Sequence, residues 1–488
     1  MGSHQFAFEF ADSPSGSGSA RKLDASSGSG FLLHTAKSMP MSDPVTPGGD
    51  TSRLLERVAS PRNLATALYH VASNKGAPGI DGRSVSDVVA LSHEILPALR
   101  ASLLSGTYEP GAVRRVWIPK PGGGQRGLGI PNVIDRVVQQ AILQVLEVIY
   151  EPTFHNSSHG FRRGRGAHTA IAEARSYVEE GRSVVVDIDL AKFFDRVNHQ
   201  RLLSRLGQRI MDRRLLKLIG QLLKADVVLP DGVRVSTEEG TPQGGPLSPL
   251  LSNIVLDEFD QELSRRGLRF VRYADDCNIF VRSERSGHRV MGSLRRFLSS
   301  RLRLEVNTEK SKVARPEEVH FLGFSLWRTK KGEIGVRMSS RTKERLDVTV
   351  RGLTPRNWGG SFSSCLSRLN RYLRGWLGYY GLCTQDGASE FKRVDAHIRR
   401  RLRALMLVRR KRPRYLYRHL RDRGVNVGES ATTAYSRRGP WYKSNTKGIN
   451  TAYPVRWFRG SLVSLWESWQ ASHPPPTSVR AQGLLFEL

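Results

Sequence analysis

Residues 270–281 carry two adjacent carboxylates, Asp275 and Asp276, in a short polar break between two apolar runs. The flanking Phe, Val and Ile residues favour strands, so the pattern predicts a strand, a tight turn and a second strand. Adjacent carboxylates repel each other, and the arrangement is costly unless a cation neutralises it. Oxygen-only ligands favour a hard ion such as Mg²⁺. A metal-free, Asp-rich hairpin turn is the alternative, and other parts of the chain are needed to choose between the two.

A second apolar run also ends in acidic residues. Residues 183–189 read Ser-Val-Val-Val-Asp-Ile-Asp, and a β-branched run of this kind is typical of a buried central strand. Such a strand can deliver a metal ligand at its end. Asp187 and Asp189 lie on the same face because side chains repeat every second residue along a strand. The residues alone leave both as candidate ligands.

Three loops have features that suit phosphates or bases. Residues 113–131 predict a hairpin with a glycine-rich tip, and Lys120 and Arg126 on its two arms could grip a triphosphate. Residues 239–249 form a glycine-rich loop that opens a helix, where Gly244 and Gly245 would allow a base pair to approach closely. The loop after His159 could bind a phosphate backbone through three arginines, Arg162, Arg163 and Arg165. Solvated basic loops are the alternative for the first and third segments.

The chain is strongly basic. Lys and Arg total 76 against 45 Asp and Glu, which gives a formal charge of +31 over 488 residues. Such a surplus implies a polyanionic partner, with nucleic acid ahead of a membrane surface. No apolar run reaches the ~18 residues of a membrane-spanning helix, and no signal-peptide core is visible near the start. The three scattered cysteines have neither zinc nor disulfide spacing, which suits a reducing compartment.

Beyond about residue 341 the chain is expected to be helical and even more basic. Arginines alternate with aromatic residues over 368–380, and more arginines cluster over 399–418. Arginine with interleaved aromatics suits contact with a charged backbone together with stacking on bases. The candidate contacts are Arg371, Arg374, Arg400 and Arg410. A solvated charged face is the alternative, but the density of arginines favours RNA or DNA.

In chain order, these segments resemble the sequence blocks of reverse transcriptases. Residues 240–253 read Gly-Thr-Pro-Gln-Gly-Gly-Pro-Leu-Ser-Pro-Leu-Leu-Ser-Asn and residues 273–276 read Tyr-Ala-Asp-Asp, which resembles group II intron-encoded reverse transcriptase/maturases. The resemblance covers roughly residues 52–470. It implies an α+β right-hand polymerase fold with fingers, a palm built on an antiparallel sheet and a helical thumb, plus a small basic DNA-binding-like region.

The domains expected from pattern and resemblance follow the chain. Residues 1–50, rich in Gly and Ser, are expected to be a disordered tail. Residues 51–338 would form fingers and palm, with 51–112 as an N-terminal extension. Residues 339–425 would form the thumb, or maturase X domain, and residues 426–488 the C-terminal DNA-binding-like region.

The resemblance also assigns the acidic residues. The first Asp of an Asp-x-x-x-x-Phe-Asp string is catalytic in the family, and here that string is residues 189–195. Asp189, Asp275 and Asp276 are therefore the expected catalytic residues and ligands of two Mg²⁺ ions, with Mn²⁺ as a substitute, and Asp187 is accessory. These ions would activate the primer 3′-hydroxyl and stabilise the leaving pyrophosphate.

Further roles are implied by the same resemblance. Lys120 and Arg126 match the triphosphate clamp, and Gln243 would lie against the incoming nucleotide. Phe194 matches the aromatic residue that excludes a ribose 2′-hydroxyl. Lys310 is the candidate general acid for pyrophosphate.

The expected function is that of an RNA-directed DNA polymerase, a nucleotidyltransferase, that binds its group II intron RNA and assists splicing. It would copy the RNA into DNA by target-primed reverse transcription for intron mobility. Partners would be the intron RNA, target DNA and deoxynucleoside triphosphates, without a membrane, in a bacterial cytoplasm in association with RNA or the nucleoid. Many members of the family carry a C-terminal endonuclease with paired cysteines. No Cys-x-x-Cys follows Cys383 in this chain, so the resemblance implies the endonuclease-lacking, group IIC-like branch.

Two alternatives stay open. The first is a domesticated group II-like reverse transcriptase in host defence or repair. The second is an RNA-binding splicing cofactor, a maturase without a significant polymerase role. The complete set of three acids and the pair of Lys120 and Arg126 argue against the second alternative.

Overall fold

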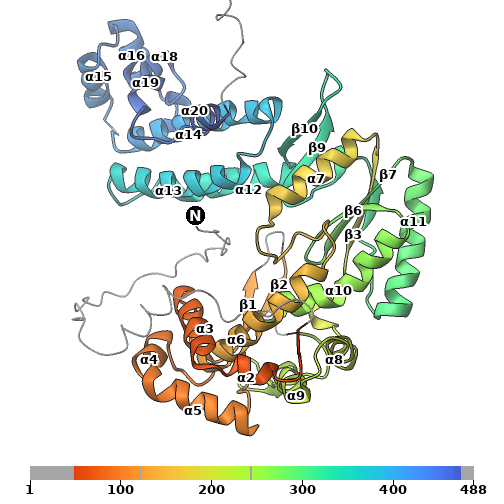
Figure 1. Ribbon diagram of the computed structural model, residues 1–488. Coiled ribbons are helices and arrows are strands. Elements are labelled where there is room, and N and C mark those ends of the chain that lie inside the picture. The colour runs from red at the N-terminus through yellow and green to blue at the C-terminus, as the bar shows by residue number, and fades with distance from the viewer. Residues whose placement is uncertain (1–48, 120–122, 242–243, 411, 474–488) are drawn as a thin grey trace, which may run out of the picture. The chain divides into compact units, whose positions relative to one another are not determined.

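The computed structural model describes residues 49–119, 123–241, 244–410 and 412–473 (Figure 1). Nearly all of the predicted tail, together with Lys120 and Gln243, lies outside the described residues. The chain divides into two compact units, which are considered separately. The first comprises Met1–Ala174 and Val184–Ala314, and the second comprises Arg175–Ser183 and Arg315–Leu488.

The first unit contains an antiparallel four-stranded sheet in the order β6-β7-β3-β8. Its strands are β3 (Val184–Asp189), β6 (Arg269–Tyr273), β7 (Asp276–Val281) and β8 (Lys312–Ala314). The predicted strand over 183–189 and the predicted strand–turn–strand over 270–281 are confirmed. The β-branched run at the start of β3 is buried, which explains its central place in the sheet.

Two helices pack on this sheet, α10 (Ser248–Arg265) against β6 and α11 (Glu284–Phe297) against β3 and β8 (Figure 1). A continuous apolar core joins them to the rest of the unit. In α10 the buried residues include Leu251, Phe259 and Leu263, together with the polar residues Asn253 and Asp260. Polar side chains in such a place need hydrogen-bond partners, because burial removes them from bulk solvent.

A second sheet of the first unit has the order β2-β1-β4-β5. The predicted hairpin over 113–131 is confirmed as the antiparallel pair β1 (Val113–Pro119) and β2 (Gln125–Ile130). The remaining strands are β4 (Val227–Val228) and β5 (Arg234–Val235). Helix α6 (Val133–Tyr150) follows the hairpin and buries its apolar face against α3 (Pro61–Ser73). The other helices that begin in this unit are α2 (Leu54–Val58), α4 (Val85–Ala90), α5 (Ser92–Ser105), α7 (Ala167–Glu179), α8 (His199–Gly207) and α9 (Arg213–Leu223).

The second unit is mainly helical, as the sequence predicts. A hairpin of β9 (Phe324–Arg328) and β10 (Ile334–Met338) precedes the helices. They are α12 (Ser340–Leu353), α13 (Phe362–Tyr380), α14 (Gln385–Val408), α15 (Pro413–Asp422), α16 (Val427–Tyr435), α17 (Pro440–Lys443), α18 (Lys447–Ala452), α19 (Val455–Phe458) and α20 (Leu465–Ser472). The side chain of Asp395 on α14 accepts hydrogen bonds from Ser464, Leu465 and Trp466, which fixes the start of α20.

The expected mixture of helices with antiparallel strands is confirmed in the described residues. No described helix is long and apolar enough to cross a membrane.

Candidate active site

Three carboxylates meet at one end of the antiparallel sheet. Asp189 ends β3, and its Cα lies opposite that of Asp276, the first residue of β7. Asp275 lies in the turn between β6 and β7. The structure thus brings together the three acids that the sequence singles out from segments more than 80 residues apart. Their role as metal ligands stays a prediction.

The pKa values of the turn carboxyls show that these charges act on one another. Partial loss of hydration and the negative charges of Asp275, Asp189 and Asp187 raise the pKa of Asp276 to about 7. Burial and the charge of Asp189 also raise the pKa of Asp275. Proximity of like charges disfavours full ionisation, so a cation placed among these oxygens would relieve an existing repulsion.

Two predicted cations act on the same group. The Lys310 Nζ lies 3.6 Å from an Asp189 carboxylate oxygen, although 64% of the lysine side chain is exposed. Its positive charge opposes the upward shift in the pKa values of Asp275 and Asp276. Arg126, on β2, exerts the same lowering effect on the pKa of Asp275. Lys310 and Arg126 therefore reach the acidic group from two other segments of the unit.

The turn before β8 holds both Asp189 and Lys310 in place. The side-chain oxygen of Asn307 accepts hydrogen bonds from the backbone N–H groups of Glu309 and Lys310, at 3.1 and 3.3 Å. The Asn307 backbone N–H donates to the Asp189 carbonyl at 2.9 Å, and the Asp189 N–H donates to the Ser311 hydroxyl at 3.0 Å. The sequence reasoning missed Asn307 and Ser311, although an Asn two residues before such N–H donors is typical of an Asx turn.

The donor chemistry of the three acids fits a hard divalent cation. Among the described residues, no group of three His, Cys, Asp or Glu side chains is gathered closely enough to hold a metal ion as it stands. The Asp189 carboxylate is instead paired with Lys310.

Phe194 follows Asp189 in the chain, lies in a short 3-10 turn, Phe193–Asp195, and is almost fully buried. Its carbonyl accepts a 2.6 Å hydrogen bond from the Thr241 N–H, which joins the turn to the glycine-rich loop. Gly240, at φ +93°, allows this approach because a Cβ there would come within 2.9 Å of the Phe194 carbonyl oxygen.

Gly244 and Gly245, in the next segment of the loop, lie close to other parts of the protein. A Cβ on Gly244 would lie 2.4 Å from the Gly129 carbonyl oxygen on β2, and one on Gly245 would lie 2.1 Å from the Gln139 side chain on α6. These glycines therefore permit close packing against the protein itself. The expected approach of a base pair at these glycines stays a prediction.

The loop after His159 corrects one predicted nucleic-acid contact. Arg162 is only 7% exposed, and its guanidinium donates to Glu151 and to the carbonyl oxygens of His155 and Ser158. This guanidinium is committed to the fold, so the prediction that it binds nucleic acid does not fit its position. Arg163 is exposed, and Arg165 is half-buried with its guanidinium on the Asn156 side chain.

In the second unit the predicted arginines differ in accessibility. Arg371 and Arg374 are exposed on α13. Arg400 is half-buried, with its guanidinium carbon 4.0 Å from the ring centre of Trp441. Arg410 is half-buried and donates to the Met406 carbonyl at 3.3 Å. The exposed pair on α13 is therefore the better placed for an external partner.

Comparison with known proteins agrees with the class that this arrangement of acids suggests. Residues 118–326 match the family described as reverse transcriptase (RNA-dependent DNA polymerase). Residues 343–424 match the family described as the maturase-specific domain of group II introns. The protein is thus an RNA-directed DNA polymerase by class. More particularly, the chain belongs to the family of group II intron-encoded reverse transcriptases.

Individual relatives give the same result. Protein YkfC of Escherichia coli K12 is 35% identical over 357 residues, which cover 64% of this chain and 91% of that protein. The group II intron-encoded protein LtrA of Lactococcus lactis is 29% identical over 373 residues, covering 62% of this chain but only 61% of LtrA. Among solved structures, a partial Cas6-RT-Cas1–Cas2 complex is 21% identical over 54% of this chain and 45% of that one, with a TM-score of 0.32, too low to support an argument.

Proposed function

We propose that this protein copies its own group II intron RNA into DNA by two-metal-ion nucleotidyl transfer, and that it assists splicing and mobility of that intron. The convergence of Asp189, Asp275 and Asp276 at one sheet end carries the proposal. The maturase-specific match over residues 343–424 supports the intron RNA as template and partner. Target DNA and deoxynucleoside triphosphates would be the other partners, at the nucleoid or on RNA in a bacterial cytoplasm.

The proposal assigns the expected right-hand subdomains to the chain. Residues 51–338 would be the fingers and palm, with 51–112 as an extension, and the sheet with β3 and β7 would form the palm. Residues 339–425 would be the thumb, and residues 426–488 a DNA-binding-like region. The helical, arginine-rich character of the second unit supports the last two assignments.

The resemblance to reverse transcriptases supports a role for each of several side chains. Asp189, Asp275 and Asp276 would hold two Mg²⁺ ions, which when bound activate the primer 3′-hydroxyl and offset charge on the leaving pyrophosphate. Arg126 and Lys120 would hold the triphosphate. The Lys310 ammonium would give a proton to the leaving pyrophosphate oxygen.

One aromatic side chain, Phe194, and one amide side chain, Gln243, would select the nucleotide. The buried ring of Phe194 would close the space needed by a ribose 2′-hydroxyl. Gln243 would lie against the incoming nucleotide. Exposed arginines such as Arg163, Arg371 and Arg374 would contact the nucleic-acid backbone.

A primer-extension assay on poly(rA)/oligo(dT) with Mg²⁺ tests the proposed chemistry. Asp275→Asn is expected to lower synthesis by at least about 10³-fold while RNA binding survives, because it removes a charged ligand without changing shape. Asp231→Asn, in an exposed turn of the same unit, is the control and should keep full activity. Retained synthesis by the Asp275 variant would refute the assignment.

Sequencing of RNA that copurifies with the full chain tests the proposed partner. Enrichment of one structured intron RNA is the expected result, because the maturase-specific domain supports a dedicated RNA partner. A broad mixture of cellular RNA without such enrichment would contradict the intron partner while leaving the polymerase chemistry intact.

A further inference from the structure

Arg272 is a fully buried arginine directly before the turn that carries Asp275 and Asp276. Its side chain is 1% exposed, and that of its ion-pair partner Asp260 is 0% exposed. Burial disfavours a charged guanidinium, but the charge and hydrogen bonds of Asp260 outweigh this effect and raise the pKa of Arg272. The arginine is therefore permanently charged in the interior.

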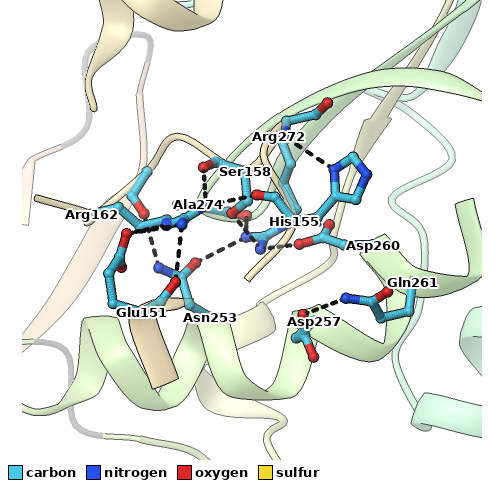
Figure 2. Close-up of polar contacts among 12 residues, drawn as sticks. Glu151, His155, Ser158, Arg162, Asn253, Asp257, Asp260, Gln261, Arg272 and Ala274 are labelled. Carbon is cyan, nitrogen blue, oxygen red and sulfur yellow. Dashed lines mark hydrogen bonds and ion pairs between the residues drawn. The ribbon is translucent and has the colours of Figure 1, made fainter. Parts of the chain in front are cut away.

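All five N–H donors of Arg272 have acceptors, and Figure 2 shows these partners around the guanidinium. Nε and Nη2 donate to the two carboxylate oxygens of Asp260 at 2.7 and 2.5 Å. Nη2 also donates to the Ser158 hydroxyl at 2.7 Å. Nη1 donates to the Asn253 side-chain oxygen at 3.0 Å and to the Ala274 carbonyl at 2.9 Å. The planar fork of a guanidinium can make this set of bonds, whereas a lysine ammonium has only three donors.

The last of these bonds reaches the acidic turn itself. Ala274 lies between Tyr273 and Asp275 and has a left-handed backbone, with φ +57°. This conformation costs a residue other than glycine about 1–2 kcal/mol, so it persists only where neighbours hold it. The Arg272 Nη1–H donated to the Ala274 carbonyl is one such restraint.

Gly160 supplies a second restraint on the same turn. A Cβ on Gly160 would lie 2.3 Å from the Ala274 backbone nitrogen and 3.0 Å from the Tyr273 carbonyl carbon. The loop backbone therefore lies directly against the acidic turn. Asn253 ties the two restraints together, because its side chain accepts from Arg272 and donates to the Gly160 carbonyl at 2.9 Å.

We propose that Arg272, Asn253 and Gly160 are positioning residues that hold the turn of Asp275 and Asp276 in the conformation needed to meet Asp189. The proposal rests on the proposed polymerase function of these acids. Figure 2 shows Asn253 and Asp260, both from helix α10, gathered around the Arg272 guanidinium together with Ser158 and Ala274. Two buried polar side chains of α10 thereby hold the turn that carries the half-buried Asp275 and the exposed Asp276.

A matched pair of buried asparagines separates positioning from plain stability. Asn253 is 0% exposed, and Asn63 is 3% exposed, donates to the carbonyls of Val58 and Ala141 and lies on α3. Asn253→Ala and Asn63→Ala should lower the Tm of the full chain by similar amounts, because each leaves comparable buried groups without partners. At a temperature where both are folded, only Asn253→Ala is expected to lower kcat for primer extension, by about 10- to 100-fold.

Two further readouts report on the turn. The KM for dTTP should change less than about threefold in Asn253→Ala, because the triphosphate contacts are untouched. Binding of Mn²⁺ alone, followed by its EPR signal in the absence of nucleic acid, should weaken about tenfold in Asn253→Ala and stay at the parent value in Asn63→Ala. A purely structural role would move Tm without moving the Mn²⁺ affinity.

A glycine pair keeps the test open if Asn253→Ala does not fold. Gly160→Ala places a methyl group against the turn backbone, whereas Gly292→Ala adds one to an exposed position of α11 with no atom within 4 Å. The expected result is a loss of kcat of at least tenfold and weaker Mn²⁺ binding for Gly160→Ala, with neither change for Gly292→Ala. Parent-like kcat and Mn²⁺ affinity in Gly160→Ala, or equal losses in Asn253→Ala and Asn63→Ala, would overturn the positioning role. An inactive parent chain would instead count against the proposed polymerase function.

Discussion

The raised pKa of the Asp276 carboxyl makes the stability of the protein depend on pH in a way that can be measured. Partial loss of hydration and three neighbouring carboxylates raise its pKa from 3.8 to about 7. Between about pH 4 and about pH 7, the Asp276 carboxyl therefore binds a proton more readily in the folded chain than in the unfolded chain. The contribution of Asp276 to stability therefore falls as the pH rises from about 4 to about 7, and above this window the charged carboxyl opposes folding.

Asp276→Asn should consequently stabilise the protein in EDTA, more at pH 8 than at pH 5. A rise in Tm of about 2 °C at pH 8 is expected, kept small because this side chain reaches solvent. Thermal unfolding of parent and variant at both pH values measures the difference, and Asp231→Asn controls for loss of one surface charge. With saturating Mg²⁺ the order should reverse, because only the parent retains the ligand. A variant less stable than the parent at pH 8 in EDTA would contradict the repulsion argument.

At the scale of elements, the turn between Asn307 and Ser311 links one end of β3 to Lys310. Asn307→Ala removes the acceptor of two backbone N–H groups and should free Lys310 from its place beside Asp189. We expect kcat to fall about 3- to 10-fold, with a loss of stability of about 1 kcal/mol, which is typical of such turns and caps. Primer extension and chemical unfolding measure the two effects.

Asp231→Ala is the matched control, because it removes a comparable side-chain acceptor from the turn between β4 and β5. It should lose similar stability without loss of kcat. Equal kcat in the two variants would show that the 307–311 turn does not position Lys310.

Elements were predictable where local pattern determines them. The strands ending at Asp189 and flanking Asp275 follow from apolar, β-branched runs with acidic ends, and the hairpin over 113–131 follows from strand pattern and glycines. The convergence of the three acids was predicted from the family resemblance. The pairing register between distant strands cannot be predicted from the sequence of either strand alone.

The supporting contacts were not predictable. The sequence around Arg162 and Arg272 does not distinguish them from exposed arginines, and only the packed structure shows that both are buried on carboxylates and carbonyls. Gly160 likewise shows no local signal that distinguishes it from the glycines of a solvated loop. Its role depends on a turn more than 100 residues away.

For the whole molecule, the formal charge of +31 predicts RNA binding that weakens steeply with salt. Each neutralised phosphate of a single strand contributes about −0.7 to the slope of log K against log salt. Arg371→Gln combined with Arg374→Gln removes two exposed charges from α13 and should make the slope less steep by about 1.4, at about 0.7 for each charge. Filter binding of a structured RNA between 50 and 300 mM salt, a range over which such contacts weaken markedly, measures it.

Arg285→Gln combined with Arg289→Gln on α11 carries the same change in net charge and is the control. If RNA follows a defined surface that includes α13, the slope changes only in the α13 pair, and Tm is unchanged in both because all four arginines are exposed. If the binding reflects net charge alone, the two pairs shift the slope equally. Equal shifts would therefore contradict Arg371 and Arg374 as direct contacts while leaving a polyanionic partner in place, because the long-range field of the chain would account for both.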